Sequence, residues 1–358
     1  MKKYKIAFHA ICLSALFSAT GFAGVLNVEF VDIFEKPIPY VTVTFTGDLM
    51  TGSIVTGADG KMAINYPSSG ASPSFCLGFR SAFYMEKPGF RFNLERGDYF
   101  LRVPCNDLPV MNLKILGTDL PPLTSVSAAD YQPRFTSDMI ATAFGDDLAA
   151  TIELATLPLK TTLAGRKLII KDSAGNEKAA RLLFVSPTQI NYISPEGLAS
   201  GRGFAKLTNE NGNVLKVGFV TAFPISPSIF TADASGKGVP AAVTVRASSG
   251  YQVYEPVFRF DPDQQKVVPA EIDLGPESEN VVLALFGTGW RQVSSVANVE
   301  IKIGGIDCPV EYASKQTTIE GLDQINVRLP RSLIGKGNAT VEVRVEGSRA
   351  NPVQIRIK

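Results

Sequence analysis

One passage of this sequence occurs twice, and that duplication restricts the possible folds more than any other feature. SPTQINYISPEG at residues 186–197 returns in altered form as GLDQINVRLPRS at residues 321–332. In both, Gln-Ile-Asn is followed by a proline after three intervening residues. The likeness extends upstream, where IATAFGDDL at residues 140–148 corresponds to VLALFGTGW at residues 282–290. A duplicated domain is therefore predicted to fill roughly the last two thirds of the chain.

Two segments rich in Pro, Ser and Ala, residues 118–133 and 223–238, separate strand-rich blocks and predict linkers. With these boundaries the chain divides into units at residues 24–117, 118–228 and 229–358. Each unit has about a hundred residues, which is enough to bury a core of its own.

Within these units the residue pattern is that of β-strands. Apolar and polar residues alternate, or β-branched residues cluster, in LNVEFVDIF, YVTVTFTG, KLIIKDS, AAVTVRAS, VEIKIGG, TVEVRVEG and VQIRIK. Hairpin turns are predicted at Asp59-Gly60, at residues 173–176 and at residues 209–213. A helix of one or two turns is the alternative at residues 143–155. With 31 Gly and 23 Pro, the sequence predicts an all-β protein of three tandem antiparallel β-sandwich, Ig-like domains.

The N-terminus has the pattern of a signal peptide. Three lysines precede an uncharged apolar stretch at residues 6–22, and Gly21 and Ala23 supply the small residues that a signal peptidase needs. We expect a leader at residues 1–23, cleaved after Ala23; a short N-terminal membrane anchor is the alternative. No later segment is long and apolar enough to span a bilayer, so the sequence predicts export without an integral membrane segment.

Removal of the leader narrows the possible chemistry. It takes His9, the only histidine, which excludes Ser-His-Asp and Cys-His mechanisms and zinc ligation through imidazole. It also takes three lysines, so that 35 Lys and Arg become 32 against 34 Asp and Glu. Because the basic residues are scattered as well, the sequence gives no reason to expect nucleic-acid binding. We predict no catalytic residues, no metal site and no cofactor.

The leader also contains Cys12, which leaves three cysteines. Export implies an oxidising compartment, and Cys76 and Cys105 fall in one unit with 28 residues between them, so a disulfide is predicted there. Two separate buried thiols are the alternative. Cys308 is expected to pack as a small hydrophobe, because no histidine remains to activate it.

Residues 125–358 resemble a known domain pair. The segments LLFVSPTQINYISPEG, FPISPSIFTADASGKG, LALFGTGW and LDQINVRLP are similar to the Solibacter-type C-terminal domain pair of exported bacterial proteins, and each half resembles an IPT/TIG-type domain. The resemblance implies tandem Ig-like modules outside the cytoplasm, without established catalysis. Cys308 stands where family members usually hold an apolar residue.

The N-terminal unit has a separate resemblance. VEFVDIFEKPIPYVTVTFTG followed by IVTGADGKMAINYP is similar to the start of a carboxypeptidase-regulatory (transthyretin-like) domain or of a bacterial Big-type domain. Both imply a β-sandwich used for spacing, stability or binding, and the likeness ends at Pro67.

The repeated Gln-Ile-Asn passages place two amides on one face of a strand. Gln189 and Asn191 share one face, as do Gln324 and Asn326. Such a pair can bind a sugar or a peptide backbone. We favour a structural role, in which the amides satisfy backbone groups of a crossing loop.

Other binding candidates are aromatic, basic and acidic. Trp290 can stack on a carbohydrate ring together with Tyr251 or Tyr254, although a lone Trp more often covers the edge of a core. Arg80 and Arg91 lie among the phenylalanines of residues 75–92, which fit either a binding surface or a strand pair around the disulfide. The acids near Asp261 and Asp146 lack the spacing of a calcium loop.

These features favour an exported, non-catalytic binding or adhesion protein, or a structural protein of the cell surface. The expected partner is a cell-surface polysaccharide or protein. The alternative is a carboxylate-dependent carbohydrate-active enzyme or an accessory module of one, which requires two acids facing each other in a cleft.

Overall fold

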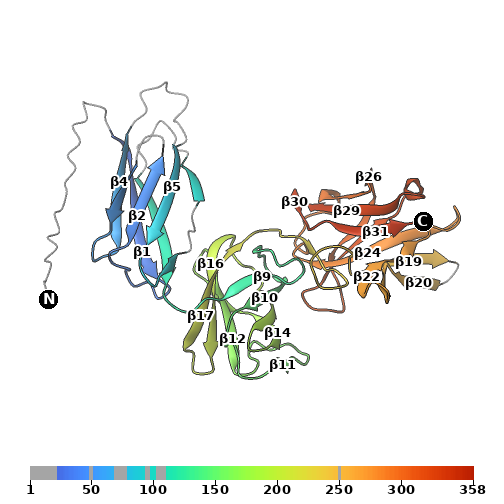
Figure 1. Cartoon of the computed structure of the whole chain (residues 1–358), viewed down its shortest axis with the longest axis horizontal. Coiled ribbons are helices and arrows are strands. Elements are labelled where there is room, and N and C mark those ends of the chain that lie inside the picture. The colour runs from blue at the N-terminus through green and yellow to red at the C-terminus, as the bar shows by residue number, and fades with distance from the viewer. Residues whose placement is uncertain (1–21, 48–50, 68–78, 93–96, 102–109, 249–250) are drawn as a thin grey trace. The chain divides into compact units, whose positions relative to one another are not determined.

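The computed structural model describes residues 22–47, 51–67, 79–92, 97–101, 110–248 and 251–358. Its regular structure there is β-strand apart from two short 3₁₀ turns, which confirms the predicted all-β class. The described residues fall into two compact units, one within residues 1–119 and the other within residues 120–358 (Figure 1). The predicted leader lies outside the described residues as far as residue 21, and so do Cys76 and Cys105.

In its described residues the first unit is a sandwich of two four-stranded sheets. One sheet has the order β4-β1-β8-β6, with β1 (Phe22–Asp32), β4 (Lys61–Pro67), β6 (Arg91–Phe92) and β8 (Val110–Thr118). The other has the order β3-β2-β5-β7, with β2 (Thr42–Gly47), β3 (Thr51–Val55), β5 (Phe79–Glu86) and β7 (Gly97–Leu101). β1 and β8 run parallel. Alternate residues of β1, such as Val28 and Phe30, face a core that includes Ile38 and Val41.

The turn at Asp59-Gly60 is not the predicted hairpin. It joins β3 to β4, which belong to different sheets, so the chain crosses the sandwich there. Gly60 has a φ of +68°, and a Cβ at this position would lie 2.6 Å from the carbonyl oxygen of Phe30. Asp-Gly marks a turn correctly, but the local sequence does not determine which sheet the next strand joins.

The second unit contains two hydrophobic cores, each between two sheets. The first core lies in the first repeat, residues 118–228. One of its sheets has the order β11-β14-β15-β10-β9, with β9 (Thr124–Ser127), β10 (Ile140–Phe144), β11 (Glu153–Leu154), β14 (Arg181–Val185) and β15 (Gln189–Ile193). The other has the order β13-β12-β16-β17, with β12 (Arg166–Lys171), β13 (Glu177–Ala179), β16 (Gly201–Asn209) and β17 (Val214–Ala222).

The second core is formed by Ile225 and by residues of the second repeat, 229–358. One sheet has the order β20-β19-β24-β28-β27, with β19 (Ala242–Ser248), β20 (Tyr251–Pro256), β24 (Asn280–Thr288), β27 (Val310–Lys315) and β28 (Asp323–Arg328), and β18 (Ser228–Ile229) also pairs with β24. The other has the order β23-β31-β29-β25-β26, with β23 (Glu271–Ile272), β25 (Val299–Ile303), β26 (Ile306–Asp307), β29 (Gly337–Val345) and β31 (Val353–Ile357), and β30 (Ser348–Arg349) pairs with β29. β21 (Phe258–Asp261) and β22 (Lys266–Pro269) form a separate hairpin.

The alternating segments named above all form strands, and the hairpins at residues 173–176 and 209–213 are confirmed. The helix considered at residues 143–155 is absent, because this segment contributes buried Leu148 to the core and then forms β11. The two predicted linkers also contain strands. β9 lies within residues 118–133 and β18 within residues 223–238, since their apolar residues pack onto the sheets.

The duplication is visible in strand register. β10 pairs with β15 as β24 pairs with β28, and both pairs are antiparallel. The matched pairs are Phe144 with Gln189 and Thr142 with Asn191 in the first repeat, and Phe286 with Gln324 and Ala284 with Asn326 in the second. Leu148 and Trp290, which end the upstream motif, are both fully buried. The repeats are therefore equivalent residue by residue at this strand pair.

A chain of ion pairs connects the two repeats. Asp138 in the first repeat pairs with Arg181 at 2.7 Å and also with Arg291 in the second. Arg291 Nε lies 2.7 Å from Asp323, whose side chain is fully buried. Arg181 also contacts Glu320 at 2.5 Å. These contacts hold the loops of the second repeat against the first.

Candidate binding groove

The outer face of the sheet β20-β19-β24-β28-β27 is hollowed and has an apolar floor. Inward residues such as Leu283 fill the core, so the alternate positions point outward. On β19 and β24 those positions hold Val243, Val245, Val282 and Ala284, of which the three valines are half-buried. The hollow has a volume of about 440 Å³, within the range of small-molecule sites. We call it the amide groove, after the side chains at its edge.

Gln324 and Asn326 of β28 line one side of the amide groove. Gln324 Nε2 donates to Asn326 Oδ1 at 2.7 Å. Within the described part of the chain, the side-chain N–H groups of Asn326 and the side-chain oxygen Oε1 of Gln324 bond to no protein group, so they are open to a ligand. The structural role favoured from sequence, bonding to backbone groups of a crossing loop, is not what these side chains do.

Gln252 and Tyr254 of the edge strand β20 line the opposite side. The Tyr254 side chain is 61% exposed, and its hydroxyl donates to Gln252 Oε1 at 2.7 Å. That bond orients the Gln252 amide and leaves its N–H groups as donors. Phe286 of β24 also lines the groove, next to Gln324 in the register.

The groove has almost no net charge. Glu311 is the only residue of its lining that carries a charge at neutral pH, and its carboxylate lies 3.3 Å from Arg328 Nε. Gln316, also in the lining, is occupied by the turn that follows it, since its carbonyl oxygen accepts from the N–H groups of Thr318 and Ile319. The surface therefore offers apolar contact and neutral hydrogen-bonding groups.

The first repeat has the same amide pair, but its own chain occupies the neighbouring space. Gln189 Nε2 donates to Asn191 Oδ1 at 2.8 Å, and the Thr142 hydroxyl donates to the same oxygen at 3.0 Å. The ring of Tyr131 packs against Phe144 with a centroid distance of 6.3 Å. At the matched positions of the second repeat, Ala284 has no hydroxyl and Phe286 faces the groove.

Of the aromatic candidates from sequence, Tyr254 lies in the groove, whereas Trp290 does not. Trp290 is fully buried, and its Nε1 donates to the carbonyl oxygen of Gln324 at 3.4 Å. Its ring belongs to the core and has no face available to a sugar. Tyr251 is the first residue of β20, and its side chain lies outside the described residues.

Arg80 and Arg91 lie on different sheets. Arg80 is on β5, which pairs with β2 and β7, and Arg91 is on β6, which pairs with β8. The described residues within 75–92 do not form a strand pair with each other, because the chain changes sheets between β5 and β6. Between Cys76 and Cys105 the strand pair is that of β5 with β7. The side chain of Arg80 lies outside the described residues.

Cys308 is buried, and its Sγ donates to the carbonyl oxygen of Ile306 at 3.4 Å. Burial raises the pKa of its thiol to about 11, which suits packing and not nucleophilic attack.

Asp261 accepts from the N–H groups of Asp263 and Gln264 and thereby closes the β21–β22 turn. Among the described residues there is no group of three His, Cys, Asp or Glu side chains that could hold a metal ion.

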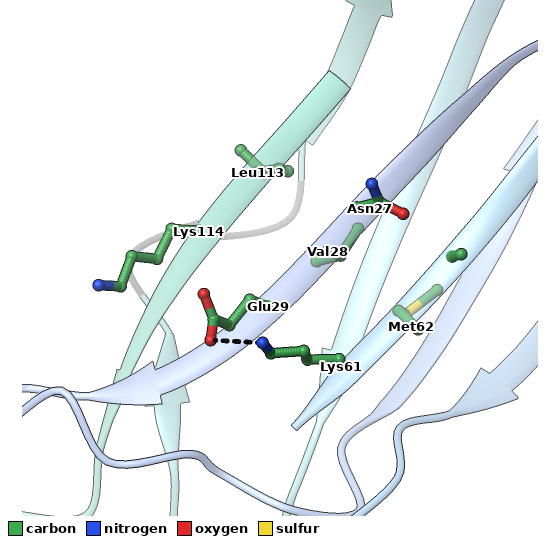
Figure 2. A pocket seen from close by; sticks show the side chains of 8 residues that line it. Asn27, Val28, Glu29, Lys61, Met62, Leu113 and Lys114 are labelled. Carbon is green, nitrogen blue, oxygen red and sulfur yellow. Dashed lines mark ion pairs between the residues drawn. The ribbon is translucent and has the colours of Figure 1, made fainter. Parts of the chain in front are cut away.

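A second hollow, of about 540 Å³, lies on the first unit over β4, β1 and β8. Figure 2 shows Glu29 of β1 facing Lys61 of β4, and their charged groups are 3.5 Å apart. Lys114 lines the same hollow but pairs with Glu35. The charged side chains that line this second hollow are thus paired with each other or with neighbouring residues. The amide groove has more polar groups that a ligand can bind.

The sequence matches no protein-family model and no curated protein. Solved structures align at low identity. The mixed-linkage glucan utilization protein SGBP-B of Bacteroides ovatus, in complex with a heptasaccharide, has 13% identity and a TM-score of 0.31, over 97% of this chain and 69% of that chain. The major pilin subunit of Bacillus cereus has 12% identity and a TM-score of 0.21, over 86% and 96%. The Bacillus anthracis TIE protein has 10% identity and a TM-score of 0.21, over 94% and 48%.

In the described residues no helix is long and apolar enough to cross a bilayer.

Proposed function

We propose that this chain is an exported, non-catalytic binding protein and that its ligand docks in the amide groove. The leader pattern at residues 1–23 supports export. The Solibacter-type resemblance of residues 125–358 also suits an extracytoplasmic module, although it brings no functional residues.

One observation carries the proposal: the groove combines a half-buried apolar floor with amide groups that have no protein partner. An outward sheet face that serves only as surface normally carries polar or charged side chains. Here three valines and Ala284 lie at those positions, and Asn326 and Gln252, which line the same groove, have side-chain N–H groups without a protein partner in the described residues. A ligand that covers such a surface lowers the free energy of the system, because it removes apolar area from water and gives the amide groups hydrogen-bond partners.

The test is a comparison of retention. The mature protein is incubated with cell-wall, polysaccharide and culture-supernatant protein fractions, next to a Val282→Lys variant that places a long cation on the floor of the groove. Thr340→Lys is the matched control, because Thr340 is exposed on β29 of the other sheet. Circular dichroism and thermal unfolding check that both variants fold.

We expect the native protein and Thr340→Lys to be retained by one defined fraction, and Val282→Lys to lose at least about tenfold in affinity. If all three proteins are retained equally, the ligand binds outside the amide groove. If none of them is retained by any fraction, the protein is interpreted as a structural spacer.

The alternative from sequence, a carboxylate-dependent carbohydrate-active enzyme, is not favoured for this groove. Acid and base catalysis of glycoside hydrolysis commonly uses two carboxyl groups about 5 to 10 Å apart. The lining contains one carboxylate, Glu311, and Arg328 neutralises it.

A further inference from the structure

We infer that the ligand of the amide groove is a neutral glycan, bound with the apolar face of a sugar ring on the floor and a hydroxyl group on Asn326. This inference rests on the proposed function, since it names the class of ligand for the same site. The side chains that occupy the corresponding positions of the first repeat indicate a glycan.

The first repeat shows which groups complete the amide pair. There the Thr142 hydroxyl donates to Asn191 Oδ1 at 3.0 Å, next to the Gln189 bond to the same oxygen. In the second repeat Ala284 takes the place of Thr142, so the second lone pair of Asn326 Oδ1 receives no donor in the described part of the chain. A ligand that restores the arrangement brings a hydrogen-bond donor to this point, as a hydroxyl group does.

The first repeat also supplies a ring. Tyr131 packs on Phe144 and is held there by a hydrogen bond from its hydroxyl to the carbonyl oxygen of Ala234 at 2.9 Å. Phe286, the counterpart of Phe144, lines the groove instead. A sugar ring matches both groups that the first repeat provides, because it combines hydroxyl donors with a flat apolar face when its C–H groups lie on one side.

Charge and position decide between ligand classes. An acidic glycan needs a basic partner, and the one lining residue that is charged at neutral pH is the acid Glu311. A peptide that adds a strand needs a free sheet edge, whereas the floor is the face of β19 and β24, both of which have neighbours on either side. A neutral, hydroxyl-rich ligand matches the unused amide groups of Gln252, Gln324 and Asn326.

The experiment converts the groove into the arrangement of the first repeat. Ala284→Thr restores the missing hydroxyl and fills the adjacent space, and the first repeat shows that the fold accepts Thr at this position. Thr142→Ala makes the opposite change in the first repeat and is the matched control. Asn326→Ala removes the amide without filling the groove.

The probes are soluble neutral polysaccharides (β-glucan, xylan, mannan and amylose), the acidic polymer polygalacturonate, and a mixture of casein peptides. Affinity electrophoresis and titration calorimetry measure binding. We expect the full mature chain to bind at least one neutral polysaccharide, Thr142→Ala to bind equally well, and Ala284→Thr and Asn326→Ala to lose at least about tenfold.

Three ways in which the inference can fail give different results. If Ala284→Thr abolishes binding only to polygalacturonate or to peptides, the ligand class is wrong and the groove remains the binding site. If a neutral polysaccharide binds Ala284→Thr and Asn326→Ala as tightly as the native chain, the glycan binds outside the groove, and both this inference and the proposed site are wrong. If no neutral polysaccharide binds, the inference is overturned, and the retention test with Val282→Lys still decides the proposed function.

Discussion

At the residue scale, Asp323 shows how a buried charge is held at the junction of the repeats. Its carboxylate accepts from the backbone N–H groups of Trp290 and Arg291 and from Arg291 Nε. Burial nevertheless raises its pKa to about 6, because the loss of hydration outweighs these contacts. The ion pair therefore fixes geometry more than it adds stability.

The substitution Asp323→Asn tests this. A folded pKa above the unfolded value means that the folded state binds the proton more tightly, so the contribution of Asp323 is fully present below about pH 4 and is lost as the pH rises through about 6. Between pH 4 and pH 7 the free energy of unfolding of the native protein should fall by roughly 2 kcal/mol relative to the variant. Chemical denaturation of both proteins at several pH values measures this difference in the free energy of unfolding. A difference that does not change with pH contradicts the raised pKa of Asp323.

Cys308 gives a second prediction at this scale. With the pKa of its thiol at about 11, the thiolate fraction at pH 8 is about a hundredfold below that of an ordinary cysteine. Iodoacetamide should therefore modify Cys308 of the folded protein at least that much more slowly than in urea, as mass spectrometry of the tryptic peptide reports. Equal rates in both conditions are inconsistent with a buried thiol.

At the element scale, both upstream motifs contain Phe-Gly, and the glycine follows from close packing. A Cβ on Gly287 would lie 2.1 Å from the ring of Trp290 and 2.3 Å from the carbonyl oxygen of Ser228. On Gly145, the counterpart, a Cβ would meet Leu148 at 2.9 Å. The tight approach to β18 and Trp290 explains why β24 needs glycine here.

We expect Gly287→Ala to lower the free energy of unfolding by about 1 to 3 kcal/mol or more, since neither backbone nor a buried ring yields easily. Gly145→Ala is the matched control and should cost less, because a Leu side chain can rotate. Thermal unfolding of both variants gives the comparison. A larger loss for Gly145→Ala speaks against this account of packing.

The strands and two of the three hairpins could be predicted from sequence because alternation and Asn-Gly or Gly-Asn turns are local signals. The sheet partners of β4 and β6 could not, since they depend on contacts between distant segments. The groove was also missed. Its one signal is the unbroken apolar run at residues 281–286, which indicates a strand with apolar side chains on both faces.

At the scale of the whole molecule, residues 120–358 form a compact unit with two cores of their own. We expect this fragment, produced alone, to fold cooperatively and to bind the same ligand as the mature chain, because the groove lies entirely within it. Circular dichroism, thermal unfolding and affinity electrophoresis test the fragment. Loss of binding in a folded fragment means that the first unit contributes to the site.

The parallel pairing of β1 with β8 has a mechanical consequence for the first unit. The two strands are neighbours over eight residue pairs, from Val25 with Val110 to Asp32 with Gly117. Because they run in the same direction, tension between the start of β1 and the end of β8 slides one strand along the other. The hydrogen bonds of this ladder then bear the load together and do not open one after another, so the unit resists pulling along the chain better than peeling from one edge.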